Sequence, residues 1–429
     1  MKFWQFGRAA LALTSSLGLA LFLNSCGGGY TIAYLYVTGA YSASSTSAPT
    51  PITILGINSQ TGAVYPVANS TAPLNYTNPV AEVVSPAQTN LYVLCQGPAG
   101  SSPVVVQYGI TNNGGNLNGD ITPIHTYNTS GTLPTSMAIN STGTYLYVVE
   151  TYALNSQTNG DIDIFPVNSD GSLGTPNVVS LTNNQNAVGV TALPGTDFVY
   201  VASWNQADTN NPNGTVWGYQ NTGGNLTLIQ TTSVGLELAS VTSYASTIGS
   251  YLYVTDESQN CIFGYSPSSS GILSGITMSG CGSAGQGAQY GVSTNAGNGS
   301  SRPTALLVEP RGKYLFVANS GSGTIGGWVI NQSQGGALSA TSSGTAVAGA
   351  QPTCLAIDPI LGKYIFTADY LSSINGGNLT QGGIVSGFSL NSSTGALSGL
   401  QNGPFIVTTT LPSCVAISTT GSIPPPGSP

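Results

Sequence analysis

Short runs of aromatic and β-branched residues recur along the chain, separated by stretches of glycine, asparagine, serine and proline. The first run is YLYVTGA (residues 34–40), and six similar runs follow it. They are NLYVLCQ from Asn90, YLYVVET from Tyr145, FVYVASW from Phe198, YLYVTDE from Tyr251, YLFVANS from Tyr314 and YIFTADY from Tyr364. Apolar runs of this length and composition, bounded by turn residues, predict β-strands.

A second phrase, usually beginning with proline, precedes every run except the first. Its copies are PVAEVVSP from Pro79, PTSMAINS from Pro134, AVGVTALP from Ala187, LASVTSYA from Leu238, PTALLVEP from Pro303, PTCLAIDP from Pro352 and PSCVAIST from Pro412. After each run comes a pattern of strand, Gly/Asn/Ser turn and strand, as in GDIDIFPVNSDGSL (160–173). One unit therefore contains four short strands, and units recur about 50 to 63 residues apart. This period predicts the four-stranded blades of a β-propeller.

The two ends of the chain carry complementary parts of this unit. The first run has no proline phrase before it, and the last proline phrase (412–419) has no aromatic run after it. We expect the C-terminal phrase to form the innermost strand of the first blade, which closes the ring and covers its edges. The sequence thus predicts an all-β, seven-bladed propeller of antiparallel blades over residues 34–423, followed by a proline-rich tail (424–429).

These repeats resemble those of the YVTN-type, lactonase-like seven-bladed β-propellers, a family that includes enzymes similar to 6-phosphogluconolactonase. The resemblance extends over nearly all of the chain beyond residue 30. It implies the fold and makes lactone hydrolysis a candidate activity. One propeller frame hosts many functions, so the activity must be argued from the residues themselves.

The N-terminal residues follow the pattern of an export signal. Lys2 and Arg8 form a positive region, and the apolar stretch 9–23 is short for a membrane span. The sequence LNSC, which ends at Cys26, resembles the lipobox of a bacterial lipoprotein. We expect a signal peptide (1–25), a lipidated Cys26 and a glycine-rich tether (26–33) that anchor the protein in the bacterial cell envelope, facing the periplasm or the exterior. The alternative is an ordinary secretory signal, which also places the protein outside the cytoplasm.

Charged residues make up only 5% of the chain, against roughly 25% in average soluble proteins. Removal of the signal leaves four basic residues, Arg302, Arg311, Lys313 and Lys363, against 14 acidic residues. So few cations cannot neutralise a phosphate backbone, which excludes nucleic acid as a partner. The membrane remains a partner through the lipid, and the protein itself is expected to be a monomer.

Strand order predicts that the long loops gather on one face of the ring. The loops that follow residues 39, 150, 203 and 369 lie there, as does the long insertion 281–302, and we call this the loop-rich face. The turns on the opposite face are short. Because loops on a rigid frame commonly carry function, we expect a binding surface on the loop-rich face.

Three carboxylates, Glu150, Asp256 and Asp369, occupy equivalent repeat positions on the loop-rich face. Any one of them is a candidate general base toward water, or each instead accepts hydrogen bonds from backbone N–H groups of its own loop. Their blades alternate, so their backbones lie well over ~10 Å apart, too far for one shared Ca²⁺. The single histidine, His125, cannot form a zinc site alone. No metal and no cofactor are predicted.

Arg302 is the only basic residue expected on the loop-rich face. It is either a solvated loop residue or a group that binds a substrate carboxylate or stabilises an oxyanion. A single cationic side chain cannot balance both charges of a phosphate ester, which argues against such a substrate. The sequence therefore favours a binding or assembly module for a glycan, a peptide or another envelope protein. The alternative is hydrolysis of a neutral or weakly anionic lactone by one of the three carboxylates with Arg302.

The cysteines of an exported chain are candidates for disulfides. Cys261 and Cys281 flank one hairpin, where a cross-strand disulfide is geometrically reasonable. Cys354 and Cys414 share one repeat position in the innermost strands of neighbouring blades, which makes them a second possible pair. Cys95 then remains a free thiol in the core.

Overall fold

The computed structural model describes most of the chain beyond residue 29. The described residues are 30–40, 51–97, 102–112, 118–154, 156, 158–208, 210, 212–281, 287–294, 301–373, 383–409 and 411–419. The predicted signal peptide (1–25), Cys26 with the glycines after it, and the tail (424–429) lie outside these residues. Within the described part, no helix has the length and apolar character needed to cross a bilayer.

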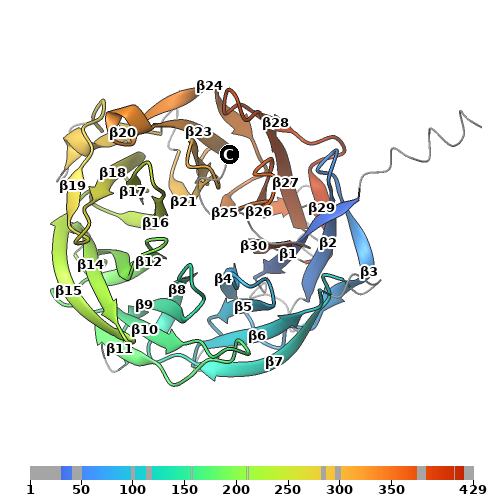
Figure 1. Cartoon of the computed structure of the whole chain (residues 1–429), viewed down its shortest axis with the longest axis horizontal. Helices are drawn as coiled ribbons and strands as arrows, with labels where there is room; N and C mark the ends of the chain where they lie inside the picture. The colour runs from blue at the N-terminus through green and yellow to red at the C-terminus, as the bar shows by residue number, and fades with distance from the viewer. Residues whose placement is uncertain are drawn as a thin grey trace, which may run out of the picture.

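Seven antiparallel sheets form blades around one central axis (Figure 1). From the axis outward, blade 1 contains β30 (Pro412–Thr419), β1 (Thr31–Gly39), β2 (Ile52–Asn58) and β3 (Val64–Ala72). Blade 2 contains β4 (Pro79–Val84), β5 (Asn90–Cys95), β6 (Val104–Ile110) and β7 (Ile121–Asn128). Blade 3 contains β8 (Thr132–Ile139), β9 (Tyr145–Tyr152), β10 (Asp161–Pro166) and β11 (Asn177–Ser180), and blade 4 contains β12 (Asn186–Ala192), β13 (Phe198–Trp204), β14 (Gly214–Thr222) and β15 (Asn225–Ser233).

Blades 5 to 7 complete the ring. Blade 5 contains β16 (Leu238–Ala245), β17 (Ser250–Asp256), β18 (Cys261–Pro267), β19 (Leu273–Gly275) and β20 (Gly291–Ser293). Blade 6 contains β21 (Pro303–Val308), β22 (Tyr314–Asn319), β23 (Thr324–Asn331) and β24 (Ala337–Val347). Blade 7 contains β25 (Pro352–Ile357), β26 (Tyr364–Ser373), β27 (Gly383–Leu390), β28 (Leu397–Gly399) and β29 (Phe405–Val407). The predicted seven-bladed, all-β propeller is confirmed.

The C-terminal strand closes the ring as predicted. β30 pairs antiparallel with β1, in a register that places Tyr36 opposite Ala416. On its other side β30 contacts the inner strands of the neighbouring blades, β4 and β25. Each inner strand thus lies between two others around the axis, and no end blade is left with an open inner edge.

The outermost strand is divided in two blades, where the sequence predicted one continuous strand. In blade 5, β19 pairs with the end of β18 near Tyr265, and β20 pairs with its beginning near Cys261. In blade 7, β28 and β29 divide the edge of β27 in the same way. A disulfide joins Cys261 to Cys281, which lies between β19 and β20.

The repeated aromatic residue is buried between blades, and it explains why the run recurs with so little change. Tyr36, Tyr92 and Tyr253 are completely buried, and their hydroxyls donate hydrogen bonds to backbone carbonyls in the outer turn of the next blade. Blades 6 and 7 carry phenylalanine at this position, and a tyrosine two residues earlier makes the contact instead. In six blades the hydroxyl donates to a backbone carbonyl: Tyr36 to Gly119, Tyr92 to Gly171, Tyr200 to Gly271, Tyr253 to Gly336, Tyr314 to Ser392 and Tyr364 to Ser59. In blade 3 the hydroxyl of Tyr147 instead accepts a hydrogen bond from the side-chain amide of Asn221 in blade 4.

Candidate functional site

A cavity of about 620 Å³ opens on the loop-rich face, where the inner strands of several blades begin. We call it the central cavity. Its lining consists mainly of amide and hydroxyl side chains together with one acid and one cation. The lining residues are Ala40, Asn78, Pro79, Val80, Gln96, Glu257, Arg302, Thr304, Ser320, Gln351, Thr353, Tyr370 and Ser413.

The residue before the strand-starting proline shapes the rim of this cavity. Asn78, Arg302 and Gln351 each precede such a proline, and each has a positive φ, of 51°, 45° and 54°. A residue before proline normally adopts an extended backbone, and a left-handed conformation is costly for any residue except glycine. Leu133 and Leu411, which also precede strand-starting prolines, share the left-handed conformation with φ of 55° and 47°.

Backbone hydrogen bonds hold this left-handed turn in place. The carbonyl of Arg302 accepts the N–H of Ser320 at 3.0 Å, and the carbonyl of Gln351 accepts the N–H of Tyr370 at 3.0 Å. The carbonyl of Asn78 accepts the N–H of Gln96 in the same manner. Each turn thus joins the start of an inner strand to the end of the strand beside it, and both residues of each pair line the central cavity.

Hydroxyl groups of the inner strands also tie neighbouring blades together beneath the rim. Thr304 donates to the carbonyl of Pro352 at 3.2 Å, and Thr353 donates to that of Ser413 at 3.0 Å. Ser413 in turn donates to the carbonyl of Pro79 at 2.8 Å. The cavity floor is therefore built from four blades whose relative positions are fixed by direct hydrogen bonds.

Arg302 and Glu257 form an ion pair at the edge of the central cavity. The Arg302 side chain is 56% exposed and that of Glu257 is 27% exposed, so both charged groups meet solvent. The backbone N–H of Arg302 donates to the side-chain oxygen of Asn260 at 2.8 Å, which anchors the residue from the blade 5 side. The pair presents a guanidinium and a carboxylate side by side to any ligand in the cavity.

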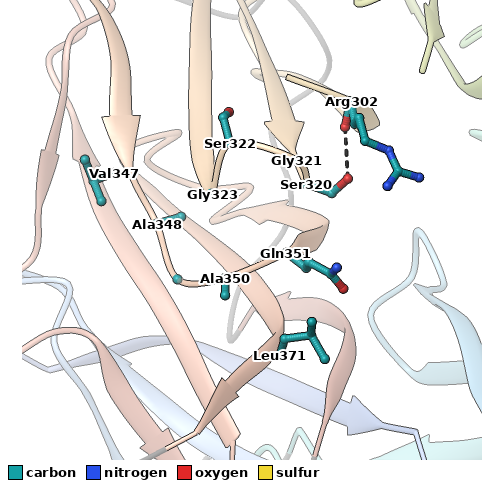
Figure 2. A pocket seen from close by; sticks show the side chains of 11 residues that line it. Arg302, Ser320, Gly321, Ser322, Gly323, Val347, Ala348, Ala350, Gln351 and Leu371 are labelled. Carbon is teal, nitrogen blue, oxygen red and sulfur yellow. Dashed lines mark hydrogen bonds between the residues drawn. The ribbon is translucent and has the colours of Figure 1, made fainter. Parts of the chain in front are cut away.

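A second cavity, of about 720 Å³, lies between blades 6 and 7 and shares Arg302, Ser320 and Gln351 with the central cavity. Figure 2 shows Arg302 at its edge, where the Ser320 hydroxyl donates to the Arg302 carbonyl at 3.0 Å. Apart from Arg302, the described residues of its lining carry no charged side chain. Arg302 therefore lies between two adjoining cavities.

The structure places two of the predicted carboxylates outside both cavity linings, close behind the rim. Asp256 is fully buried and accepts the N–H groups of Leu236, Glu237 and Gln259 and the Ser258 hydroxyl. Burial raises the pKa of Asp256, and these hydrogen bonds oppose that rise.

Asp369 is also fully buried and accepts the Ser386 hydroxyl at 2.6 Å. Burial raises its pKa to about 7 against the effect of this hydrogen bond. Its neighbour Tyr370 lines the central cavity, whereas Asp369 does not.

The third predicted carboxylate, Glu150, lies within blade 3. It is fully buried, accepts the N–H of Gly131 at 2.7 Å and is hydrogen-bonded by the Thr129 hydroxyl. The structure does not bring Glu150, Asp256 or Asp369 together with Arg302 in a cavity lining. Asp256 accepts the N–H of Gln259 in the loop that follows it, whereas Glu150 and Asp369 are held by other segments, through Gly131 and Ser386.

Sequence reasoning missed Glu257, the acid that does line the central cavity. The signal was present, because Glu257 directly follows Asp256 and begins the turn after β17 on the loop-rich face. It also missed Glu82 on β4, whose Oε1 accepts the N–H and hydroxyl of Thr38 at 3.1 and 2.6 Å. Burial raises the pKa of Glu82 to about 8.

The remaining cysteine candidates lie side by side. The sulfur atoms of Cys354 and Cys414 are 2.6 Å apart on the neighbouring inner strands β25 and β30, with no bond between them. Cys95 is a buried free thiol.

No model of a protein family matches the sequence, and no curated protein matches it. Solved structures do match. The periplasmic gluconolactonase PpgL of Pseudomonas aeruginosa is 16% identical, with a TM-score of 0.68, over 91% of this chain and 100% of that chain. A putative 6-phosphogluconolactonase of Bacteroides uniformis ATCC 8492 gives 17% identity, a TM-score of 0.67 and coverages of 90% and 100%.

Another putative 6-phosphogluconolactonase, from Bacteroides fragilis NCTC 9343, is 14% identical with a TM-score of 0.66, over 90% of this chain and 98% of that chain. Sequence identities this low establish a common fold and nothing finer. The chain shares the seven-bladed propeller fold of solved 6-phosphogluconolactonase-like and gluconolactonase structures.

Proposed function

We propose that the protein hydrolyses a neutral or weakly anionic lactone in the central cavity. The observation that carries this proposal is the pairing of Glu257 with Arg302 in a cavity lined by amides and hydroxyls. The similar structures are described as lactonases, which supports this reading more than the binding or assembly module that the sequence favoured.

In the proposed reaction, Glu257 accepts a proton from water as the water oxygen attacks the lactone carbonyl carbon. Arg302 stabilises the negative charge that develops on the carbonyl oxygen. The bond between the carbonyl carbon and the ring oxygen then breaks, and the ring oxygen takes a proton from Glu257. The product is an open-chain hydroxy acid, which releases its carboxylic proton to solvent, and Arg302 can hold the resulting carboxylate.

The composition of the lining supports this substrate class. Asn78, Gln96 and Gln351 offer amide donors and acceptors, which suit the hydroxyl groups of a sugar-derived lactone. Arg302 is the only cation in the described lining, and it is already paired with Glu257. A dianionic phosphate ester would lack a second positive partner in this cavity.

The proposed compartment is the bacterial cell envelope, with anchoring through a lipid on Cys26. The signal pattern of residues 1–25 supports it, as does the periplasmic description of one similar structure. Replacing Cys26 by serine should abolish incorporation of a labelled fatty acid in a bacterial host and release the protein from the membrane fraction. Unchanged labelling in the variant would contradict lipidation at this residue.

Activity is tested by proton release in a pH-stat, using the purified protein and a panel of neutral sugar and acyl lactones. We expect Glu257→Gln and Arg302→Ala to lower kcat/KM by about 100-fold or more, which is typical for loss of a general base or an oxyanion donor. The matched control is Lys313→Ala, an exposed cation in a turn of the opposite face. Turnover no faster than the uncatalysed rate with every lactone would reject the proposal and favour a binding module.

A further inference from the structure

Glu150 belongs to a buried group of three carboxylates in blade 3, which we call the blade 3 carboxylate cluster: Glu150, Asp161 and Asp163. Glu150 on β9 lies directly opposite Asp161 on β10, and Asp163 follows two residues later on the same face. One oxygen from each of the three lies within 4.8 Å of the others. All three residues are completely buried.

Several oxygens of this cluster lack a hydrogen bond of ordinary geometry, although the Leu154 N–H and the Glu150 carboxyl lie near enough to Asp161 to affect its pKa. In the part of the chain that the structure describes, neither carboxylate oxygen of Asp161 and not Oδ1 of Asp163 accepts a hydrogen bond of ordinary geometry. The other oxygens are held in place, since Gly131 N–H binds Glu150 and Ser130 N–H binds Asp163, both at 2.7 Å. Buried polar atoms are rarely left unpaired, because their desolvation is costly.

The sequence offers no basic side chain to balance these charges. Between Arg8 and Arg302 the chain contains no lysine and no arginine. Its only histidine, His125, lies on the outer strand β7, where its ring contacts Tyr127. Three buried carboxylates therefore need either protons or a bound cation to be stable.

Oxygens of the cluster approach the backbone closely at Gly131. A Cβ atom added to this glycine would come within 2.5 Å of the Tyr152 carbonyl oxygen and 2.6 Å of both Asp161 Oδ1 and Glu150 Oε2. Three oxygens thus converge on the space beside Gly131. This residue is not among those with positive φ, so the backbone conformation does not demand glycine here. The missing side chain lets these three oxygens approach the backbone closely.

From this geometry we propose that the blade 3 carboxylate cluster binds one Ca²⁺ ion, with the Tyr152 carbonyl as a further ligand. The ligands are all oxygen, the donor type that Ca²⁺ and Mg²⁺ prefer over transition metals. Calcium accepts irregular oxygen cages at 2.3–2.6 Å, whereas Mg²⁺ demands an octahedral site and keeps several waters.

The ion would act as a bridge between two blades. Thr129, Ser130 and Gly131 connect blade 2 to blade 3 and hold Glu150 and Asp163 through their hydrogen bonds. A cation bound to the cluster fixes β9, β10 and this connection at one point. The site is separate from the central cavity, whose described lining contains none of its residues.

The test uses Tb³⁺, a luminescent substitute for Ca²⁺, with the purified full chain stripped of metal by a chelator. We expect one saturable Tb³⁺ site, excited through nearby tyrosine and displaced by Ca²⁺, and a Tm that rises by a few degrees in saturating Ca²⁺. Asp161→Asn should abolish both effects. Asp170→Asn, which changes an exposed acid in a turn of the same blade, should preserve them.

Two outcomes would overturn the inference. One is Tb³⁺ binding that is unsaturable or unchanged in Asp161→Asn. The other is a wild-type Tm that does not change with Ca²⁺, together with a higher Tm for Asp161→Asn. That result would mean that shared protons, and not a cation, stabilise the carboxylates. If Asp161→Asn fails to fold by circular dichroism, Asp163→Asn, which removes a different ligand, is subject to the same two criteria.

Discussion

Burial raises the pKa of acidic side chains in this propeller, and Glu82 is one example. Glu82 projects from the inner strand β4 of blade 2, where Thr38 of the neighbouring blade supplies its two hydrogen bonds. Its second carboxylate oxygen has no hydrogen-bond partner among the described residues. Burial outweighs the two hydrogen bonds, so the pKa of Glu82 rises from its ordinary value of 4.5 to about 8.

This shift predicts that stability falls as the pH rises from about 4.5 to about 8. In that window the folded protein keeps a proton on Glu82 that the unfolded chain has lost, and the folded state therefore binds more protons. Urea denaturation at pH 5 and pH 8 measures the difference. Glu82→Gln, which keeps the shape but cannot ionise, should reduce the decline. An identical decline in wild type and variant would show that Glu82 does not cause it.

The candidate site was only partly predictable at the residue scale. Arg302 was placed on the correct face because the strand order determines where its loop lies. Asp256 is buried in the fold whereas Glu257 lines the central cavity, so the structure offers an acid that the sequence analysis did not name. A residue before proline normally has an extended backbone, so the left-handed conformation found here could not be predicted from local sequence. The backbone hydrogen bonds at the cavity rim explain it.

At the scale of elements, the repeated aromatic run determines both a strand and its contact with the next blade. The number, order and closure of the strands followed from the repeat, because each phrase corresponds to one strand. The division of the outer strands in blades 5 and 7 did not follow from it. Those short pieces pair only at the edge of the sheet, where local sequence constrains the chain least.

The tyrosine contact between blades can be tested by removing a single hydroxyl group. Tyr92→Phe removes a buried hydroxyl that donates to the Gly171 carbonyl at 2.6 Å and leaves the aromatic ring in place. We expect the free energy of unfolding to fall by about 1–3 kcal/mol, since the buried carbonyl loses its donor. Tyr30→Phe, at an exposed tyrosine, is the control and should have no measurable effect. Equal stabilities of the two variants would contradict the role given to the hydroxyl.

At the scale of the whole molecule, ring closure depends on β30 and the strands beside it. Cys354 and Cys414 lie at this junction, with their sulfurs 2.6 Å apart and a separation of 60 positions in the sequence. A disulfide between them stays a prediction, tied to the proposed envelope location, where a protein disulfide would oxidise the two thiols and take up the two electrons. The bond would fasten blade 7 to blade 1 at the point where the ends of the chain meet.

Alkylation of the unreduced protein followed by mass spectrometry tests this pair. We expect Cys95 alone to be alkylated after unfolding, and the double variant Cys354→Ser/Cys414→Ser to lose about 2–4 kcal/mol of stability. Labelling of Cys354 and Cys414 without reductant would show that both remain thiols. The disulfide between Cys261 and Cys281 serves as the internal control for oxidation.

The tyrosine contacts run in one direction around the ring, from each blade to the outer turn of the next, and Tyr364 of blade 7 returns to Ser59 of blade 1. Every blade therefore contacts the next blade through its tyrosine and is contacted by the preceding one, and the ring has no terminal blade. A linear array of repeats needs special end units to cap it. This propeller closes on itself instead. Duplicating or deleting one blade would change the angle between neighbouring blades, and with it the geometry of all seven tyrosine contacts at once.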